Sequence, residues 1–129
     1  MATREDIESY IVRLGMPYEE VDTGLWIIHD EHDGIDNLVI HFAPPVAVFR
    51  VKLMDLDGDH PALYRRLLEL NASDMVSGAY GIENNSVVCV ESLQVENLDF
   101  NEFQAAVDSL SLAITDHYET LRAVLAGAA

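Results

Sequence analysis

The stretch GAYGIENNSVVCV, residues 78–90, decides the fold because it holds a complete β-hairpin. Ala79–Glu83 and Val87–Leu93 are rich in strand-forming side chains and flank the dipeptide Asn84-Asn85. Asparagine tolerates the positive φ angles that both central residues of a type I′ turn adopt. The sequence therefore predicts two antiparallel strands joined by a tight turn.

The only cysteine of the chain, Cys89, lies in the second strand of this hairpin. It alternates with valines, and no Lys, Arg or His stands near it in the sequence to lower the pKa of its thiol. We therefore expect a buried, unreactive side chain that serves as a small hydrophobic part of the scaffold. One cysteine cannot form an intrachain disulfide, as expected for a protein of the reducing cytoplasm.

Three further strands are predicted ahead of the hairpin. Leu25–His29 and Asn37–Phe42 are rich in β-forming residues and are joined by the polar turn DEHDGID, residues 30–36. Pro44-Pro45 interrupts the ladder, and Val46–Leu53 resumes it. Successive side chains of a strand point to opposite faces. The expected core face consists of Ala47, Phe49, Val51 and Leu53, and the opposite face of Val46, Val48, Arg50 and Lys52.

Helical spacing of apolar residues predicts three helices. The first follows a cap at Thr3 and ends before Pro17, and the second begins at Pro61 and stops near Asn71. The third follows a cap at Asp99 and is about 25 residues long, or near 37 Å. Its apolar stripe comprises Phe103, Val107, Leu110, Ile114, His117, Leu121 and Val124. Because this helix is long for so small a domain, we expect part of the stripe to pack on a second copy of the chain.

The resulting order, α-β-β-β-α-β-β-α, predicts an α+β fold with a mainly antiparallel sheet packed against helices, in a single domain of residues 1–129. The charged start and the short apolar blocks indicate neither a signal peptide nor a membrane span. With 23 acidic against 7 basic residues the net charge is −16, and the repulsion of phosphate backbones argues against nucleic acid as a partner.

The few basic residues are unevenly distributed. Arg50, Lys52, Arg65 and Arg66 lie within 17 residues, whereas segments 14–49 and 67–121 contain no Lys or Arg. Two interpretations stay open for these four side chains: solvated positions, or a contact surface for an acidic partner or a second subunit. The strand face formed by Val46, Val48, Arg50 and Lys52 is our candidate partner-binding site.

No pattern of catalytic residues or of cofactor ligands emerges. The residues His29, Asp30, His32 and Asp33 resemble a metal-ligand cluster, to which His41 could add a ligand, so a small-ligand or metal-responsive sensor is the alternative function. The acidic residues around Gly58 lack the spacing of a calcium loop and are better explained by turn and cap roles. His117 is expected to be a core or interface histidine rather than a general base. We therefore predict a protein that is not an enzyme and carries no cofactor.

Residues 64–118 resemble the C-terminal half of the YbjN-like and Tir-chaperone families, which share the fold of type III secretion chaperones. The shared features are LLELNA at the end of the middle helix, the strand GAYGIE, an Asn-rich turn, the strand VVCVESL, and ENLDFNEF ahead of a long helix that ends near a His-Tyr pair. The resemblance implies a non-enzymatic homodimer that holds another polypeptide, either an effector or a regulatory client. No catalytic residue comes with it.

Overall fold

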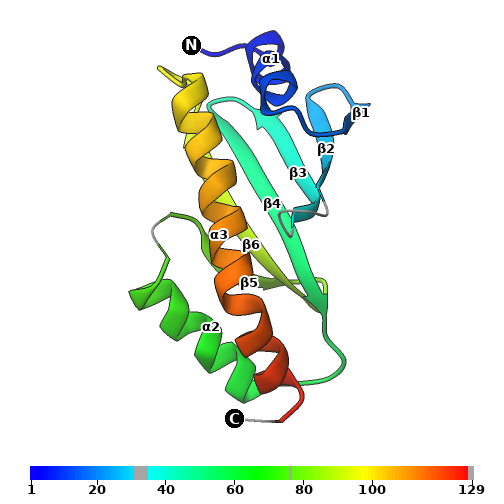
Figure 1. Ribbon diagram of the computed structural model, residues 1–129, viewed down its shortest axis with the longest axis vertical. Coiled ribbons are helices and arrows are strands. Elements are labelled where there is room, and N and C mark those ends of the chain that lie inside the picture. The colour runs from blue at the N-terminus through cyan, green and yellow to red at the C-terminus, as the bar shows by residue number, and fades with distance from the viewer. Residues whose placement is uncertain (31–34, 76, 128–129) are drawn as a thin grey trace.

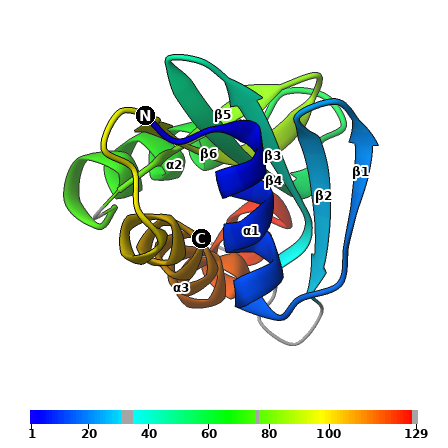
Figure 2. The same cartoon turned by 90° about the horizontal axis from the view of Figure 1, so that it is seen from above.

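The computed structural model describes residues 1–30, 35–75 and 77–127. The elements are α1 (Arg4–Leu14), β1 (Tyr18–Asp22), β2 (Leu25–Asp30), β3 (Ile35–Ala43), β4 (Val46–Asp55), α2 (Pro61–Ser73), β5 (Ala79–Glu83), β6 (Ser86–Gln94) and α3 (Phe100–Leu125). The strands form one antiparallel six-stranded sheet in the order β1-β2-β3-β4-β6-β5. The sheet curves around the three helices, which all lie on its concave side (Figures 1 and 2). The predicted α+β class and antiparallel sheet are confirmed.

The sheet has one strand more than predicted, because β1 pairs with β2 along the edge. Its sequence, YEEVD, has little intrinsic preference for a strand. Contacts with distant residues hold it instead. The Arg4 guanidinium at the start of α1 forms an ion pair with Glu20, and Glu20 also accepts a hydrogen bond from the backbone of Gly24 at 3.0 Å. These two interactions, the one from Gly24 first, lower the pKa of the Glu20 carboxyl.

The β5–β6 hairpin is confirmed in detail. Asn84 and Asn85 have φ angles of 50° and 58°, as a type I′ turn requires. Tyr80 lies opposite Cys89 in the ladder, and both side chains are buried on the concave face beneath the helices.

Asn71 does not end α2, as the sequence suggested, because the helix continues to Ser73. Its side chain instead donates to the carbonyl of Tyr80 at 3.0 Å and accepts from the Tyr80 amide at 2.8 Å. The side-chain amide of Asn71 therefore takes the place of a neighbouring strand along the free edge of β5, the edge that does not pair with β6. This edge of the sheet is closed at Tyr80 by α2.

The core lies between the concave face of the sheet and the helices. As predicted, Ala47, Phe49 and Val51 of β4 face it and are buried, whereas Leu53, at an irregularity of the strand register, is only partly buried against it. The apolar stripe of α3 is buried by the chain itself except at its last member, Val124, which is half-buried: Phe103, Val107, Leu110, Ile114, His117 and Leu121 are all buried within one copy. The stripe is therefore not available as a dimer surface, contrary to our expectation, since a curved sheet covers more of a long helix than two neighbouring helices would.

Candidate functional site

The convex side of the sheet, which we call the outer face, is the side that no helix of the described residues covers (Figure 2). Strand register places alternate residues of four strands on it. Its apolar members are Leu25, Ile27, Val39, Val46, Val48, Val88 and Val90. Antiparallel sheets that face water usually carry polar residues on that side. The outer face also carries polar side chains, so aliphatic and polar residues are interspersed on it: His41, Arg50, Lys52, Ser92 and Gln94.

The apolar side chains of the outer face form rows across the sheet. Ile27 lies opposite Val39 on the next strand, and Val39 lies opposite Arg50. Arg50 in turn lies opposite Val90. Directly opposite residues have Cβ atoms about 4.5–5.5 Å apart, so their side chains touch. Most of them are only half-buried, because their neighbours on the same face provide the shielding that a helix provides on the concave side.

Arg50 is the charged residue at the centre of the outer face. Its Nε lies 3.5 Å from the Glu83 carboxylate, and within the described part of the chain this buried nitrogen has no hydrogen-bond acceptor. The guanidinium is thus close to one counter-charge but incompletely hydrogen-bonded. A guanidinium in this position, with valines beside it, can donate hydrogen bonds to a carboxylate of another molecule.

The structure brings the four sequence-predicted residues onto this one face. Val46, Val48 and Arg50 are half-buried, and Lys52 is exposed and forms an ion pair with Asp55 at 3.1 Å. The hydrogen bond from Lys52, followed by one from Ser86, lowers the pKa of the Asp55 carboxyl. Their role in partner binding stays a prediction.

The four neighbouring bases do not form one surface. Arg50 and Lys52 belong to the outer face, whereas Arg65 and Arg66 lie on α2, which packs against the concave side (Figure 2). Both α2 arginines contact Glu69, at 3.8 and 3.9 Å. Only the β4 pair can belong to the candidate site.

The histidine-rich turn gives no support to a metal site. His32 and Asp33 lie outside the described residues, and so does the side chain of Asp30. Register places His29 four positions away from the residue that pairs with His41, which corresponds to about 13 Å along the strand. Among the described residues, no group of three or more His, Cys, Asp or Glu side chains is arranged to hold a metal ion.

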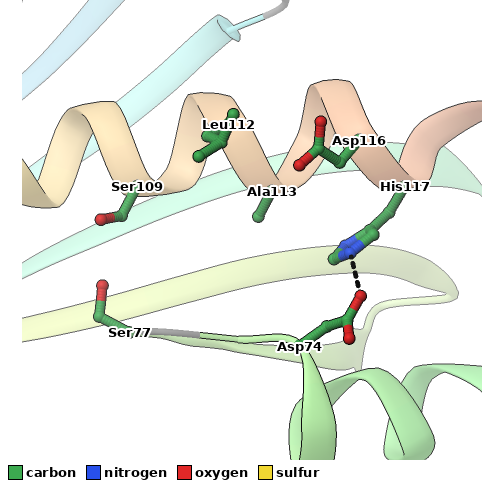
Figure 3. A pocket seen from close by; sticks show the side chains of 7 residues that line it. All are labelled: Asp74, Ser77, Ser109, Leu112, Ala113, Asp116 and His117. Carbon is green, nitrogen blue, oxygen red and sulfur yellow. Dashed lines mark hydrogen bonds and ion pairs between the residues drawn. The ribbon is translucent and has the colours of Figure 1, made fainter.

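A pocket of ≈ 140 Å³ lies on the helix side of the molecule, between α3 and the segment that connects α2 to β5. It is lined by Asp74, Ser77, Ser109, Leu112, Ala113, Asp116 and His117 (Figure 3). The sequence did not indicate this pocket, because Asp74 and His117 are 43 positions apart.

His117 forms the inner end of the pocket and is 8% exposed. Its Nδ1 is 2.8 Å from the Tyr80 hydroxyl, and its Nε2 is 3.3 Å from an Asp74 carboxylate oxygen. Burial raises the pKa of the Tyr80 phenol, so this hydroxyl stays neutral. Because both ring nitrogens are engaged, the imidazole has no free position from which to activate a serine of the pocket. His117 is a buried structural histidine, as expected.

These observations define an α+β protein with one sheet face that no described helix covers, bearing both aliphatic and polar side chains, and without the geometry of a nucleophilic catalytic site in the described residues. A family model for CesT_Tir_1 matches residues 1–126. The chain belongs to this family. Chaperones of this family are not enzymes. No curated protein matches the sequence.

Three solved structures share the fold at 15% sequence identity. A chain of the heterodimeric complex ExoU-SpcU from the type III secretion system of Pseudomonas aeruginosa gives a TM-score of 0.68, and the match covers 92% of this chain and 97% of that one. YbjN, a putative transcription regulator from E. coli, gives a TM-score of 0.69, and the match covers 92% of this chain and 93% of the YbjN chain. A chain of the HopA1-SchA chaperone-effector complex gives a TM-score of 0.64, and the match covers 90% of this chain and 92% of that one. The fold that the sequence resemblance implied is confirmed. No helix among the described residues is long and apolar enough to cross a membrane.

Proposed function

We propose that this protein is a non-enzymatic binding module that holds another polypeptide on the outer face of its sheet. The observation that carries the proposal is a sheet face that no described helix covers, on which seven partly buried aliphatic side chains and several polar ones surround the incompletely hydrogen-bonded Arg50. A contiguous apolar patch on the surface of a folded domain marks an interaction site. A partner segment with apolar residues and an acidic side chain fits this surface.

Membership of the CesT_Tir_1 family supports a polypeptide as the partner. Two of the similar structures, ExoU-SpcU and HopA1-SchA, are complexes of two proteins, the second of them described as a chaperone with its effector. We extend this to the present chain as an effector or regulatory client, and we propose the cytoplasm as the compartment in which it is held.

The sheet edges add a second possible contact to the proposal. An extended peptide can join the edge of a sheet through main-chain hydrogen bonds. The β5 edge is closed at Tyr80 by Asn71, so β1 is the edge left for such an addition. β1 borders β2, whose Leu25 and Ile27 belong to the outer face, so one partner chain can occupy both surfaces.

The decisive experiment compares capture of partners from the source cells by two variants. Val48→Thr combined with Val90→Thr removes two methyl groups from the outer face without changing its shape. We expect roughly tenfold less of each specifically retained polypeptide in mass spectrometry, because apolar area is no longer buried on binding. Val12→Thr is the matched control, since Val12 is an exposed valine of α1, 56% exposed. Unchanged retention by the double variant, with an unchanged urea midpoint, would contradict the proposal.

We also propose that the protein works as a homodimer. Support comes from exposed leucines on the helix side: Leu68 of α2 is 68% exposed and Leu112 of α3 is 62% exposed. The charge of −16 on each copy opposes association, so salt should strengthen the dimer by screening. We expect sedimentation at twice the chain mass of 14.3 kDa at about 10 μM, more completely at the higher of two salt concentrations. A single 14.3 kDa species at both salt concentrations would exclude the dimer.

A further inference from the structure

The positive charges of the sheet are concentrated on one strand. Segments 14–49 and 67–121, which contain the other described strands, have no Lys or Arg, so the lysine and arginine of the sheet both lie on β4. These two residues, Arg50 and Lys52, are on the outer face. In a chain with a net charge of −16, this part of the face is where an acidic group of another molecule finds the nearest attraction.

The two bases differ in how well the chain itself satisfies them. Lys52 donates to the Asp55 carboxylate at 3.1 Å, and Asp55 also accepts from the Ser86 hydroxyl at 2.9 Å. The counter-charge of Arg50 is Glu83, with 3.5 Å between Nε and the Glu83 Oε1, and the buried Nε has no hydrogen-bond acceptor among the described residues. Buried donors are rarely left without an acceptor. The Lys52 pair is therefore complete, whereas the Arg50 pair leaves a donor unused.

The position of Glu83 in the hairpin explains why its contact with Arg50 is incomplete. Glu83 is the last residue of β5 and pairs with Ser86 across the turn. Because β6 lies between β5 and β4, the Glu83 side chain reaches Arg50 only across a neighbouring strand. A carboxylate of another molecule has no such tether and can align with the guanidinium. The Glu83 side chain is 49% exposed and that of Arg50 42%, so Glu83 can turn away into water.

We propose that Glu83 is an internal substitute for a carboxylate of the bound polypeptide, and that an aspartate or glutamate side chain of this partner displaces it from Arg50. The inference rests on the proposed function and adds how the outer face selects its partner. Val39 and Ile27 lie on one side of Arg50 in its row across the sheet, and Val90 lies on the other. The acid therefore belongs to the interior of a segment with apolar residues before and after it. A partner without this acid leaves the Glu83 contact in place.

The displacement can be measured by NMR titration of the whole chain with acetyl-Thr-Val-Glu-Val-Thr-amide and its Gln analogue. The Glu peptide should shift the signal of the Arg50 Nε–H, because this proton gains an acceptor, and the Gln peptide should leave it in place. Glu83→Gln removes the internal competitor, so we expect it to bind the Glu peptide about three- to fivefold more tightly. Arg50→Gln should remove the preference for the Glu peptide.

Glu19→Gln is the matched control for Glu83→Gln. Glu19 is exposed on β1 opposite Ile27, so its replacement removes the same charge from the same face, three strands away from Arg50. Its affinity for the Glu peptide should stay within about 1.5-fold of the original, because exposed charges more than about 10 Å apart are largely screened at 0.1 M salt. Equal gains for the two variants, weaker binding by Glu83→Gln, or an unshifted Arg50 signal with the Glu peptide would each overturn the inference.

The outer-face variants described above separate this inference from the proposed function. If Val48→Thr with Val90→Thr lowers the retention of polypeptides while the Glu peptide leaves the Arg50 signal unshifted, only the inference fails. If retention is unchanged as well, both fail. Glu83→Gln should keep the urea midpoint of the original chain, because an exposed ion pair contributes little to stability, so a change in its affinity reports on binding alone.

Discussion

Phe103→Ala is expected to lower the free energy of unfolding by about 3–5 kcal/mol, the loss that follows when a fully buried phenylalanine leaves a cavity. Phe103 is 0% exposed at the start of α3. Its ring centroid lies 5.2 Å from that of Phe49 on the sheet and 5.5 Å from that of Tyr10 on α1. The substitution therefore loosens three elements at once, and its cost cannot be recovered by the movement of a single neighbour.

Urea unfolding followed by the fluorescence of the buried Trp26 measures this loss. Phe100→Ala, one turn earlier on the same helix, is the control. Phe100 is half-buried and lies under the Arg13 guanidinium, 3.8 Å from its ring centroid, so its removal should cost only about 1 kcal/mol. Equal losses for the two variants would show that the junction of α1, α3 and the sheet is not the centre of the core.

The elements that could be predicted from the sequence are those whose signal is local. The Asn84-Asn85 turn, the cap at Thr3 and the alternation along β4 each depend on residues within a few positions of one another. β1 could not be predicted, because its strand character comes from pairing with β2 and from an ion pair with Arg4. Tertiary contacts overrode the low strand propensity of YEEVD.

The candidate site was predictable only in part for the same reason. Alternation gave the residues that share a face with Arg50, but only the topology shows that this face has no helix over it. The pocket could not be predicted, because its walls come from distant parts of the sequence: Asp74 and Ser77 face residues 109–117 of α3 (Figure 3). Asn71 shows why residue type alone is not enough. Asparagine favours the end of a helix, yet the Asn71 side chain binds the backbone of Tyr80 in a strand.

The reactivity of the Cys89 thiol should differ strongly between the folded and the unfolded chain. The side chain is 0% exposed, and burial, followed by the nearby Glu91 charge, raises the pKa of its thiol from 9.0 to about 12. Only the thiolate reacts with alkylating reagents. At pH 8 about a tenth of the thiol is ionised in the unfolded chain, and about one part in ten thousand in the folded chain.

Native Cys89 should therefore be labelled at least about a thousandfold more slowly than the urea-unfolded chain at pH 8, because reaction requires opening of the β5–β6 hairpin. The raised pKa of the Cys89 thiol also predicts how the stability of the fold changes at alkaline pH. The folded state retains its proton up to about pH 12 while the unfolded state loses it from pH 9, so the thiol's contribution to stability is complete below pH 9 and is lost between these values. Cys89→Ala should remove this part of the alkaline destabilisation while leaving the part that comes from Tyr80. Equal labelling of folded and unfolded protein would show that the hairpin exposes a reactive thiol and is not the scaffold on which the outer face depends.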